Sequence, residues 1–284
     1  MMTNKIVMVT GANSGIGRVT SRELAKMGAT VVMVCRDQLK GQAVQDDINA
    51  EIGMDRVHLL IADFSSHESI RKMTEQFKLQ FDRLDVLVNN AGLMVKDKIF
   101  TEDGFEYTMG VNHFGYFLNT HYLLDVLKKS NKARIVNVAS MAHRMGTLDF
   151  DNMNGEKSFQ YFKQYCLTKL CNIQFTNHLS KYLEGTHITA NSLHPGMVNS
   201  NFGNGSYPSI VNVLGSLIMI SPEKGAETSI YLASSSEVKN VTGAYFAKSK
   251  RAFPSAFANN AKACEKLWNW SLEKTNIETF GKIS

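Results

Sequence analysis

Short apolar runs alternate along this chain with longer stretches in which apolar residues recur at helical spacing. The runs at 6–9, 30–35, 57–62, 84–88, 134–139, 187–193 and 241–246 predict strands. The stretches 18–28, 38–52, 68–80, 102–129 and 158–184 between them predict helices. Strand and helix alternating six times predict an α/β fold, a doubly wound parallel sheet with helices on both faces. No linker, repeat or low-complexity segment interrupts this order, so we interpret residues 1–284 as a single domain.

Composition narrows the classes of protein that fit this pattern. Hydrophobic residues make up 44% of the 284 positions, which is enough for a full core. The formal charge of +5 comes from scattered residues, so we do not expect nucleic-acid binding. Four cysteines without Cys-x-x-Cys spacing predict free thiols in a reducing compartment rather than a metal site or disulfides. The first strand follows the start without a signal-like segment, and no apolar run could span a bilayer, so we expect a cytoplasmic protein without a transmembrane span.

A glycine-rich turn joins the first predicted strand to the first predicted helix, within Thr10-Gly11-Ala12-Asn13-Ser14-Gly15-Ile16-Gly17. Gly11 permits a tight turn, Gly15 leaves no Cβ in the way of a pyrophosphate, and Gly17 lets helix and strand pack closely. The helix N-terminus offers N–H groups and a positive dipole end to phosphates. A purely structural turn is the alternative, but the strand–helix context favours dinucleotide binding.

The end of the second strand is where such folds select their cofactor. Here a neutral Cys35 is followed by the cationic Arg36, and Arg18 offers a second positive group. An arginine accepts the 2′-phosphate of NADP(H), whereas an acidic residue binds the ribose 2′-hydroxyl of NAD(H). We therefore predict NADP(H), with NAD(H) as the alternative that Asp37 keeps open. At the end of the third strand, Asp63 either accepts from an adenine amine or belongs to a helix cap.

Polar residues in otherwise apolar surroundings mark two further places. Asn89, Asn90 and Gly92 follow the fourth strand directly. We interpret Asn89 as structural, and we place Gly92 against the cofactor ribose. Asn112 interrupts the apolar face of the predicted helix 102–129, so it is either a structural hydrogen-bonding residue or a site residue.

The candidate chemistry depends on Tyr165 and Lys169, which lie four residues apart and therefore on one face of a predicted helix. Tyrosine is a poor base at neutral pH, but a neighbouring ammonium favours its phenolate. Such a pair can move a proton to or from an alcohol oxygen while hydride moves at its carbon. Ser140, at the end of the fifth strand, can orient the same oxygen. An exposed helix face is the alternative interpretation of the pair.

Two C-terminal segments bear on the substrate. The apolar stretch near 200–222 is bracketed by Pro208 and Pro222. It predicts a lid over a lipophilic substrate, a helix packed into the core, or a segment in peripheral contact with a membrane surface. A tail helix near 262–273, bearing Trp268 and Trp270, can pack on this lid or on a second subunit.

Together these motifs resemble the short-chain dehydrogenase/reductase family of Rossmann-type oxidoreductases. The matching residues, in order, are Thr10-Gly11-x-x-x-Gly15-x-Gly17, Asn89-Asn90-Ala91-Gly92, Asn112, Ser140, Tyr165-x-x-x-Lys169 and Pro195-Gly196. The resemblance implies that Tyr165 is the general acid/base and Ser140 the substrate-positioning group. It also implies that Lys169 lowers the pKa of the tyrosine and binds a ribose hydroxyl, and that Asn112 holds a proton-relay water.

The same resemblance implies a cofactor-binding set. We expect contacts from Gly11, Ser14, Gly15, Ile16, Gly17, Arg36, Asp63, Phe64, Asn90, Gly92, Tyr165, Lys169, Pro195, Gly196, Val198 and Ser200. Ser200 corresponds to the residue that bonds the nicotinamide carboxamide, and Val198 approaches the same ring. No metal is implied, and the family suggests a homo-oligomer.

Within the family, the chain is similar to the retinol dehydrogenase branch. Shared details are Cys35-Arg36-Asp37, Val111-Asn112-His113-Phe114-Gly115, His194-Pro195-Gly196-Met197-Val198 and the long interval from Ser140 to Tyr165. Ser200 stands where threonine is more usual, and we expect no counterpart of the anchoring N-terminal segment of animal members. The expected function is NADP(H)-dependent interconversion of a lipophilic alcohol and its aldehyde or ketone, of the retinol/retinal kind. The alternatives are a steroid or xenobiotic carbonyl reductase and a non-catalytic NADP(H) sensor or scaffold.

Overall fold

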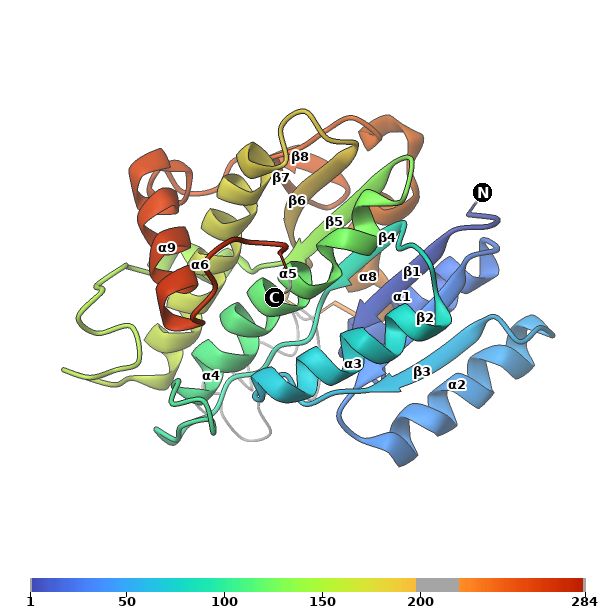
Figure 1. The fold of residues 1–284 in the computed structure, drawn as a ribbon, viewed down its shortest axis with the longest axis horizontal. Coiled ribbons are helices and arrows are strands. Elements are labelled where there is room, and N and C mark those ends of the chain that lie inside the picture. Colours follow the sequence, from blue (N-terminus) through green and yellow to red (C-terminus); the bar gives the residue numbers. More distant parts are fainter. Residues whose placement is uncertain (1, 198–219, 283–284) are drawn as a thin grey trace.

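An eight-stranded sheet forms the centre of the protein in the computed structural model, which describes residues 2–197 and 220–282 (Figure 1). The strand order is β3-β2-β1-β4-β5-β6-β7-β8, and all pairs are parallel except β7 with β8. The strands are β1 Ile6–Thr10, β2 Thr30–Cys35, β3 Val57–Ile61, β4 Val86–Asn89, β5 Ala133–Val138, β6 Ile188–His194, β7 Tyr245–Ala247 and β8 Lys250–Ala252. The order reverses between β1 and β4, and ligands bind at such a switch point in doubly wound folds. The predicted fold class is confirmed.

Helices cover both faces of the sheet (Figure 1). They are α1 Gly15–Lys26, α2 Gln38–Ile52, α3 His67–Gln80, α4 Tyr107–Met109, α5 Gly115–Lys128, α6 Tyr161–Tyr182, α8 Pro222–Ser234 and α9 Ala261–Lys274. Buried residues of α1, α2 and α8 pack with one set of strand side chains, and those of α3, α5 and α6 pack with the other. The central strands β1, β2, β4 and β5 thus bury both of their faces, which explains why their sequences are continuous apolar runs.

Two parts of the chain depart from the predicted elements. The predicted helix 102–129 is divided, because a π-helical turn at Gly110–Phe114 separates α4 from α5. The predicted last strand 241–246 lies instead at β7, and it is followed by β8, an antiparallel strand that the pattern did not predict. Lys248 and Ser249, in the turn between them, have φ angles of 51° and 55°. Such hairpin turns usually carry Asn or Gly, so the sequence lacked the usual signal.

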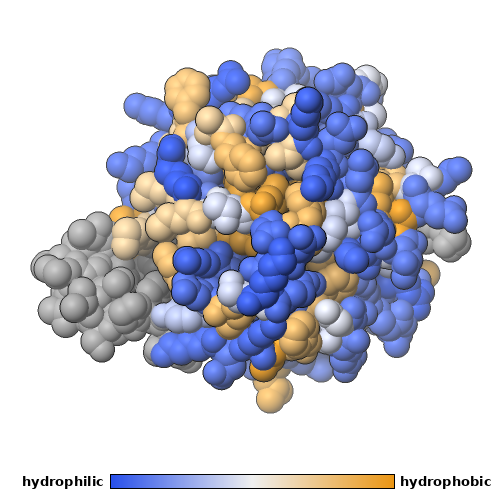
Figure 2. Space-filling model, turned by 90° about the vertical axis from the view of Figure 1, so that its left-hand side faces the viewer, coloured by the Kyte–Doolittle hydropathy of each residue, from blue (hydrophilic) through white to orange (hydrophobic). Residues whose placement is uncertain are grey.

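The tail helix α9 packs on its own domain. Trp268 lies 5.9 Å from Phe175 and 4.6 Å from His178 between ring centroids, both on α6, and Trp270 is also buried. Our expectation that these tryptophans pack on a lid or a second subunit is therefore wrong for Trp268, which packs on rings of α5 and α6 and on Phe280 of its own chain. On the side of the molecule that carries α9, hydrophilic side chains surround smaller groups of hydrophobic ones (Figure 2). The predicted lid near 200–222 lies mostly outside the described residues.

Within residues 2–197 and 220–282, the helices are too short or too polar to cross a bilayer. The same residues contain no group of three or more His, Cys, Asp or Glu side chains that could hold a metal ion. The four cysteines are free and buried.

Candidate functional site at the carboxyl edge of the sheet

The glycine turn follows β1 directly and is held by the segment after β4. Gly11 has a φ of 65°, which favours glycine. A Cβ on Gly17 would lie 2.2 Å from the carbonyl oxygen of Gly11, so only glycine fits where α1 passes the loop. Asn90 donates through Nδ2 to the carbonyls of Thr10 (2.8 Å) and Gly11 (3.3 Å). Asn90 therefore shapes the turn with its side chain, a role that the sequence pattern did not reveal.

The N-terminus of α1 differs from those of the neighbouring helices. Ser14 occupies the N-cap position of α1 without a capping hydrogen bond from its side chain. In contrast, Asp37 caps α2 and Ser66 caps α3. Backbone N–H groups of the first turn of α1 are thus left for another acceptor, which fits an anionic group such as a pyrophosphate. Ser14 is exposed, and Ile16 beside it is partly buried.

Charged residues gather at the ends of β2 and β3. Arg36 Nη1 lies 3.8 Å from Asp63 Oδ2 and donates to Tyr107 Oη at 3.0 Å. Asp37 accepts from the backbone N–H of Lys40 at 3.0 Å and pairs with Lys40 Nζ at 3.2 Å. These contacts hold the pKa of Asp37 below its ordinary value. The structure thus brings Arg36 and Asp63 together and engages Asp37 as a helix cap.

The other candidates in this area are placed less favourably. Arg18 turns towards Asp47, with 3.3 Å between Nη2 and Oδ2. Phe64 is buried, and a Cβ on Gly115 would lie 2.8 Å from its Cδ1, so its ring packs against the start of α5. Asp63 is not the cap of α3; its Oδ1 accepts from Ser65 instead, through the backbone N–H at 2.9 Å.

Lys169 lies one turn after Tyr165 on α6. Its Nζ is 5.6 Å from the centroid of the Tyr165 ring and donates to the carbonyl oxygen of Val138 at 3.2 Å. Lys169 is only 3% exposed, and this burial lowers the pKa of its ammonium to about 7. Tyr165 is half-buried on the same helix. The structure therefore brings the two side chains together, and it also buries the ammonium of Lys169, which the spacing alone did not indicate.

Ser140 follows β5 and begins a 3-10 turn at Met141–Met145. Its Oγ accepts from the backbone N–H of Ala142 at 3.2 Å, and the hydroxyl can still donate its proton to another acceptor. This turn packs directly on α6, because a Cβ on Gly146 would lie 2.5 Å from the carbonyl oxygen of Cys166. Ser140 and Tyr165 thus stand on two elements that touch each other.

Asn112 is buried within the π-helical turn. Its amide exchanges two hydrogen bonds with the backbone of Leu93, at 2.8 and 2.9 Å, and donates to Thr168 Oγ1 at 3.1 Å. A Cβ on Gly92 would lie 3.3 Å from both Asn112 Oδ1 and Lys169 Nζ. The structure therefore brings Gly92, Asn112 and Lys169 together. Asn112 lies in the middle of the π-helical turn, a geometry that often marks functional sites.

Several residues at this edge have a role in packing that the sequence left open or missed. Asn89 is fully buried and donates to Thr120 Oγ1 (3.1 Å) and Asn137 Oδ1 (2.9 Å), which agrees with our structural interpretation. Tyr116, which sequence analysis missed, donates to the carbonyl of Val138 at 3.4 Å. Burial raises the pKa of Tyr116 well above its ordinary value. In the sequence, the only indication that Tyr116 lies near the site is its spacing of four residues from Asn112.

The segment after β6 contains the last predicted cofactor residues. Gly196, which follows Pro195, has a φ of 100°, and a Cβ there would lie 2.5 Å from Ile220 Cδ1. Its backbone N–H donates to His194 Nδ1 at 3.2 Å. Val198 and Ser200 lie outside the described residues.

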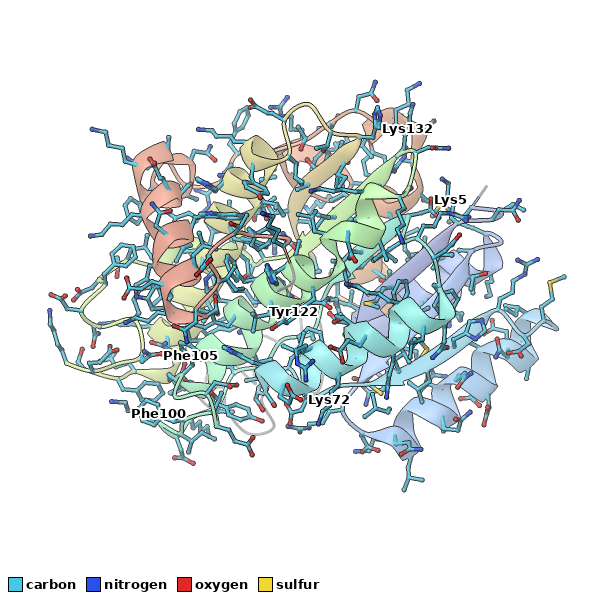
Figure 3. The ribbon with its side chains drawn as sticks, viewed as in Figure 1. Lys5, Lys72, Phe100, Phe105, Tyr122 and Lys132 are labelled. Carbon is cyan, nitrogen blue, oxygen red and sulfur yellow. The ribbon has the colours of Figure 1, made fainter. Side chains whose placement is uncertain are left out.

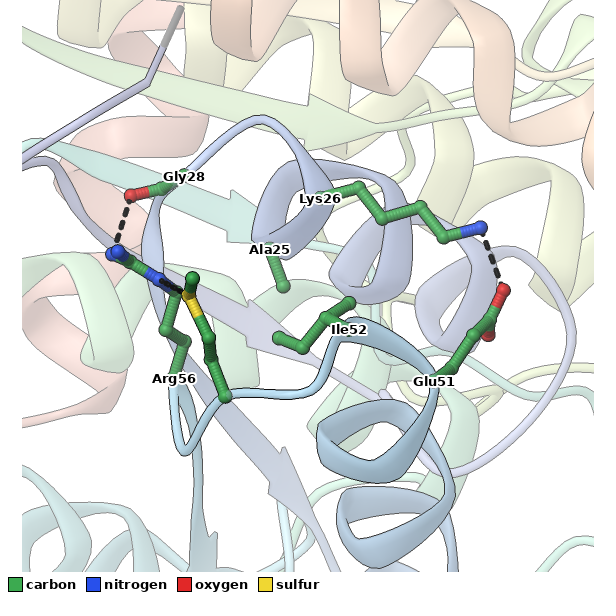
Figure 4. Close-up of a pocket in the computed structure, with 7 residues that line it drawn as sticks. Ala25, Lys26, Gly28, Glu51, Ile52 and Arg56 are labelled. Atoms are coloured by element: carbon green, nitrogen blue, oxygen red, sulfur yellow. Dashed lines mark hydrogen bonds and ion pairs between the residues drawn. The ribbon is translucent and has the colours of Figure 1, made fainter.

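Two surface hollows in the described part of the chain lie at the opposite edge of the sheet. Lys5 and Lys132, which precede β1 and β5, mark that edge (Figure 3). The hollow in Figure 4 has a volume of about 290 Å³. Lys26 in its wall pairs with Glu51 at 2.6 Å, and Arg56 donates to the carbonyl of Gly28 at 3.0 Å. A second hollow of about 330 Å³ is lined by Lys132 and the start of β6. Neither hollow contains a residue of the predicted site.

Comparisons with known proteins agree with this geometry. The short chain dehydrogenase family model matches residues 5–209. Retinol dehydrogenase 12 of Mus musculus is 41% identical over 275 residues, covering 96% of this chain and 87% of that protein. Retinol dehydrogenase 11 of Homo sapiens is 40% identical, covering 96% and 86%.

Solved structures give the same result. An uncharacterised protein from Mycobacterium Paratuberculosis superposes with a TM-score of 0.81 at 30% identity, covering 99% of this chain and 96% of that chain. The Pseudomonas aeruginosa RhlG/NADP active-site complex gives a TM-score of 0.70 at 26% identity, covering 86% and 94%.

Proposed function

This chain belongs to the short-chain dehydrogenase/reductase family, and from that premise we propose that it interconverts a lipophilic alcohol and its aldehyde or ketone with NADP(H), a retinoid being the favoured substrate. Membership makes it an oxidoreductase acting on CH–OH groups. The retinoid follows from relatives near 40% identity that are named retinol dehydrogenases. The observation that carries the choice of cofactor is Arg36 at the end of β2, beside an Asp37 whose carboxylate is already engaged by Lys40.

The residues present fit a dinucleotide. Glycine at 17 lets α1 begin directly against the turn at Gly11, where a Cβ would lie 2.2 Å from the Gly11 carbonyl oxygen, and the first turn of α1 has no side-chain cap. Arg36 is exposed and can turn its guanidinium from Asp63 to a 2′-phosphate, which it can bind with two parallel hydrogen bonds. Asp37 has no carboxylate oxygen clear of Lys40 for a ribose 2′-hydroxyl. The similarity to the RhlG/NADP complex supports the same choice.

A nicotinamide dinucleotide held by these residues would supply or accept the hydride. In the reductive direction, the phenol of Tyr165 donates its proton to the carbonyl oxygen of the substrate, and it takes the proton back in the oxidative direction. Ser140, whose Oγ already accepts from Ala142, donates its hydroxyl proton to the same oxygen and orients it. In its protonated form, Lys169 favours the phenolate of Tyr165 by its positive charge. Asn112 holds the backbone of Leu93 by two hydrogen bonds. Gly92 has no Cβ, and this leaves space next to Lys169 Nζ.

Arg36→Ala tests the choice of cofactor. Loss of a charge-assisted contact to the 2′-phosphate raises the KM for NADPH about 10- to 100-fold, since such contacts contribute roughly 1.5–3 kcal/mol. The KM for NADH changes little, because NADH has no phosphate there. Arg71→Ala is the charge-matched control: Arg71 lies on α3 and pairs with Glu68 and Glu75. A wild-type preference for NADH, with no effect of Arg36→Ala, contradicts the proposal.

A substrate panel tests the rest. The test follows the loss of NADPH absorbance as retinal, steroid ketones and simple aldehydes are reduced, at matched concentrations. Highest kcat/KM for retinal supports the proposed substrate, whereas a preference for steroids or small carbonyls favours the alternative reductase. Tight NADPH binding without oxidation by any carbonyl favours the non-catalytic sensor.

Residence in the cytoplasm, a homo-oligomeric state and the absence of nucleic-acid binding stay predictions. Cell fractionation, light scattering and a DNA-binding titration, respectively, measure them.

A further inference from the structure

We propose that His143 is a positioning residue for Ser140. Its ring binds the main-chain carbonyl of Ser140 and, on the other side, the segment that follows β8, so that Ser140 is held relative to that segment. The catalytic part of this inference rests on the proposed function, in which Ser140 orients the substrate oxygen. His143 belongs to none of the sequence motifs described above, and its side chain is only 1% exposed.

The ring of His143 makes a hydrogen bond with each nitrogen. Nδ1 lies 2.7 Å from the carbonyl oxygen of Ser140, and Nε2 lies 3.0 Å from the backbone nitrogen of Ser255. A carbonyl only accepts and a backbone N–H only donates, so the ring is neutral, with its proton on Nδ1. The same serine carbonyl also accepts the backbone N–H of His143 at 3.2 Å. Two donors from one residue thus fix the serine at the end of β5.

The segment 253–258, which we call the strap, connects the catalytic elements. Arg144 donates through Nη2 to the carbonyl of Phe253 at 2.7 Å, next to the bond from His143 to Ser255. From the other side, Gln174 of α6 donates to the carbonyl of Phe257 at 3.1 Å. The strap is therefore bonded both to the turn after Ser140 and to the helix that carries Tyr165. A shift of the strap would be passed to Ser140 through His143.

Two charged or titratable neighbours of the ring favour its neutral form. Arg144 on the same turn and His194 on β6 both oppose a positive charge there, and Lys248 faces His194. The ring of Tyr245 on β7 packs against it edge-on, at 5.3 Å between centroids. Burial is the largest cause that lowers the pKa of His143, Arg144 lowers it further, and the hydrogen bond to the Ser140 carbonyl partly offsets both. Protonation would place an N–H on Nε2 against the N–H of Ser255, and it would break the connection to the strap.

Two substitutions separate the two hydrogen bonds. The amide nitrogen of asparagine is as far from Cβ as Nδ1, so His143→Asn keeps a donor for Ser140 and loses the acceptor for Ser255. The amide oxygen of glutamine is as far from Cβ as Nε2, so His143→Gln keeps the acceptor for Ser255 and loses the donor for Ser140. We expect His143→Gln to lower kcat about 5-fold with little change in KM, because one net hydrogen bond contributes about 1 kcal/mol, and His143→Asn to lower kcat less than about 3-fold.

A double-mutant cycle shows whether the effect passes through Ser140. In a Ser140→Ala background, His143→Gln is expected to change kcat less than about 2-fold. Full additivity of the two losses, equal losses in the two His143 variants, or wild-type kcat in His143→Gln overturns the proposal. A merely structural histidine would lower the melting temperature without these differences.

Two measurements do not need turnover, so they judge this inference even if the proposed function fails. Hydrogen exchange of the amides in 140–146 is expected to be about 10-fold faster in His143→Gln than in wild type, and less affected in His143→Asn. In wild-type protein labelled with ¹⁵N-histidine, His143 is expected as the Nδ1–H tautomer at neutral pH. The Nε2–H tautomer overturns the proposal even where a variant does not fold. A wild type that oxidises no NADPH with any carbonyl overturns the proposed function alone.

Discussion

Replacing Lys169 by methionine removes a buried ammonium and keeps the volume of its stem. Lys169 is 3% exposed, and burial lowers the pKa of its ammonium from 10.5 to about 7. In the unfolded chain the pKa is the ordinary one. Between pH 7 and pH 10.5, the unfolded chain therefore binds more protons at this group than the native protein does. Stability of the wild type consequently rises with pH across this window, and below pH 7 the full cost of burying the charge is present.

The magnitude follows from the size of the shift. One pKa unit corresponds to about 1.36 kcal/mol, so raising the pH from 7 to 9.5 adds about 3 kcal/mol to the free energy of unfolding through this one group. The methionine variant lacks that contribution. We expect Lys169→Met to be more stable than wild type below pH 7, and the difference to shrink by about 3 kcal/mol by pH 9.5.

Urea unfolding, followed by fluorescence of the buried Trp268 and Trp270, measures this difference. Lys163→Met is the control, because Lys163 is an exposed lysine on the same helix. Its stability curve is expected to run parallel to that of wild type. If Lys169→Met also runs parallel to wild type from pH 6 to 9.5, the burial argument for Lys169 is refuted.

Two further substitutions test the remaining parts of the site. Tyr165→Phe removes only a hydroxyl, so we expect kcat to fall about 10²- to 10⁴-fold while NADPH affinity measured by fluorescence changes little; near-full turnover would exclude the proton-transfer role. Gly17→Ala would set a Cβ 2.2 Å from the Gly11 carbonyl oxygen, so we expect a loss of about 1–3 kcal/mol in stability and weaker NADPH binding. Gly185→Ala is its control: its φ is 80° with no atom within 4 Å, so it should cost stability without changing NADPH affinity.

The elements that could be predicted from the sequence are those determined by residues close to one another along the chain. The continuous apolar run at β2 and the glycine turn before α1 each indicate structure within a few residues of themselves. The spacing of Tyr165 and Lys169 needs only a helix to bring the two residues to one face. In the same way, Asn89 was interpreted as structural because a polar side chain at the end of a buried strand needs partners.

What the sequence did not reveal depends on distant contacts or on unusual backbone. β8 pairs through a turn of Lys248 and Ser249, residues that seldom adopt positive φ. His143 meets Ser255 across 112 positions, so neither residue carries a local signal of the other. The desolvation of Lys169 likewise arises from packing of α6 on β5, which no spacing rule measures.

The carbonyl of Val138 explains why the Lys169→Met experiment isolates charge from hydrogen bonding. That oxygen accepts from Lys169 Nζ at 3.2 Å, from Asn172 Nδ2 at 3.3 Å and from Tyr116 Oη at 3.4 Å. A carbonyl oxygen has two lone pairs, so three donors share it. Methionine at 169 therefore leaves the buried oxygen paired, and the usual penalty for an unsatisfied acceptor does not arise. The stability change that depends on pH must then come from the ammonium itself, because neither remaining donor is charged.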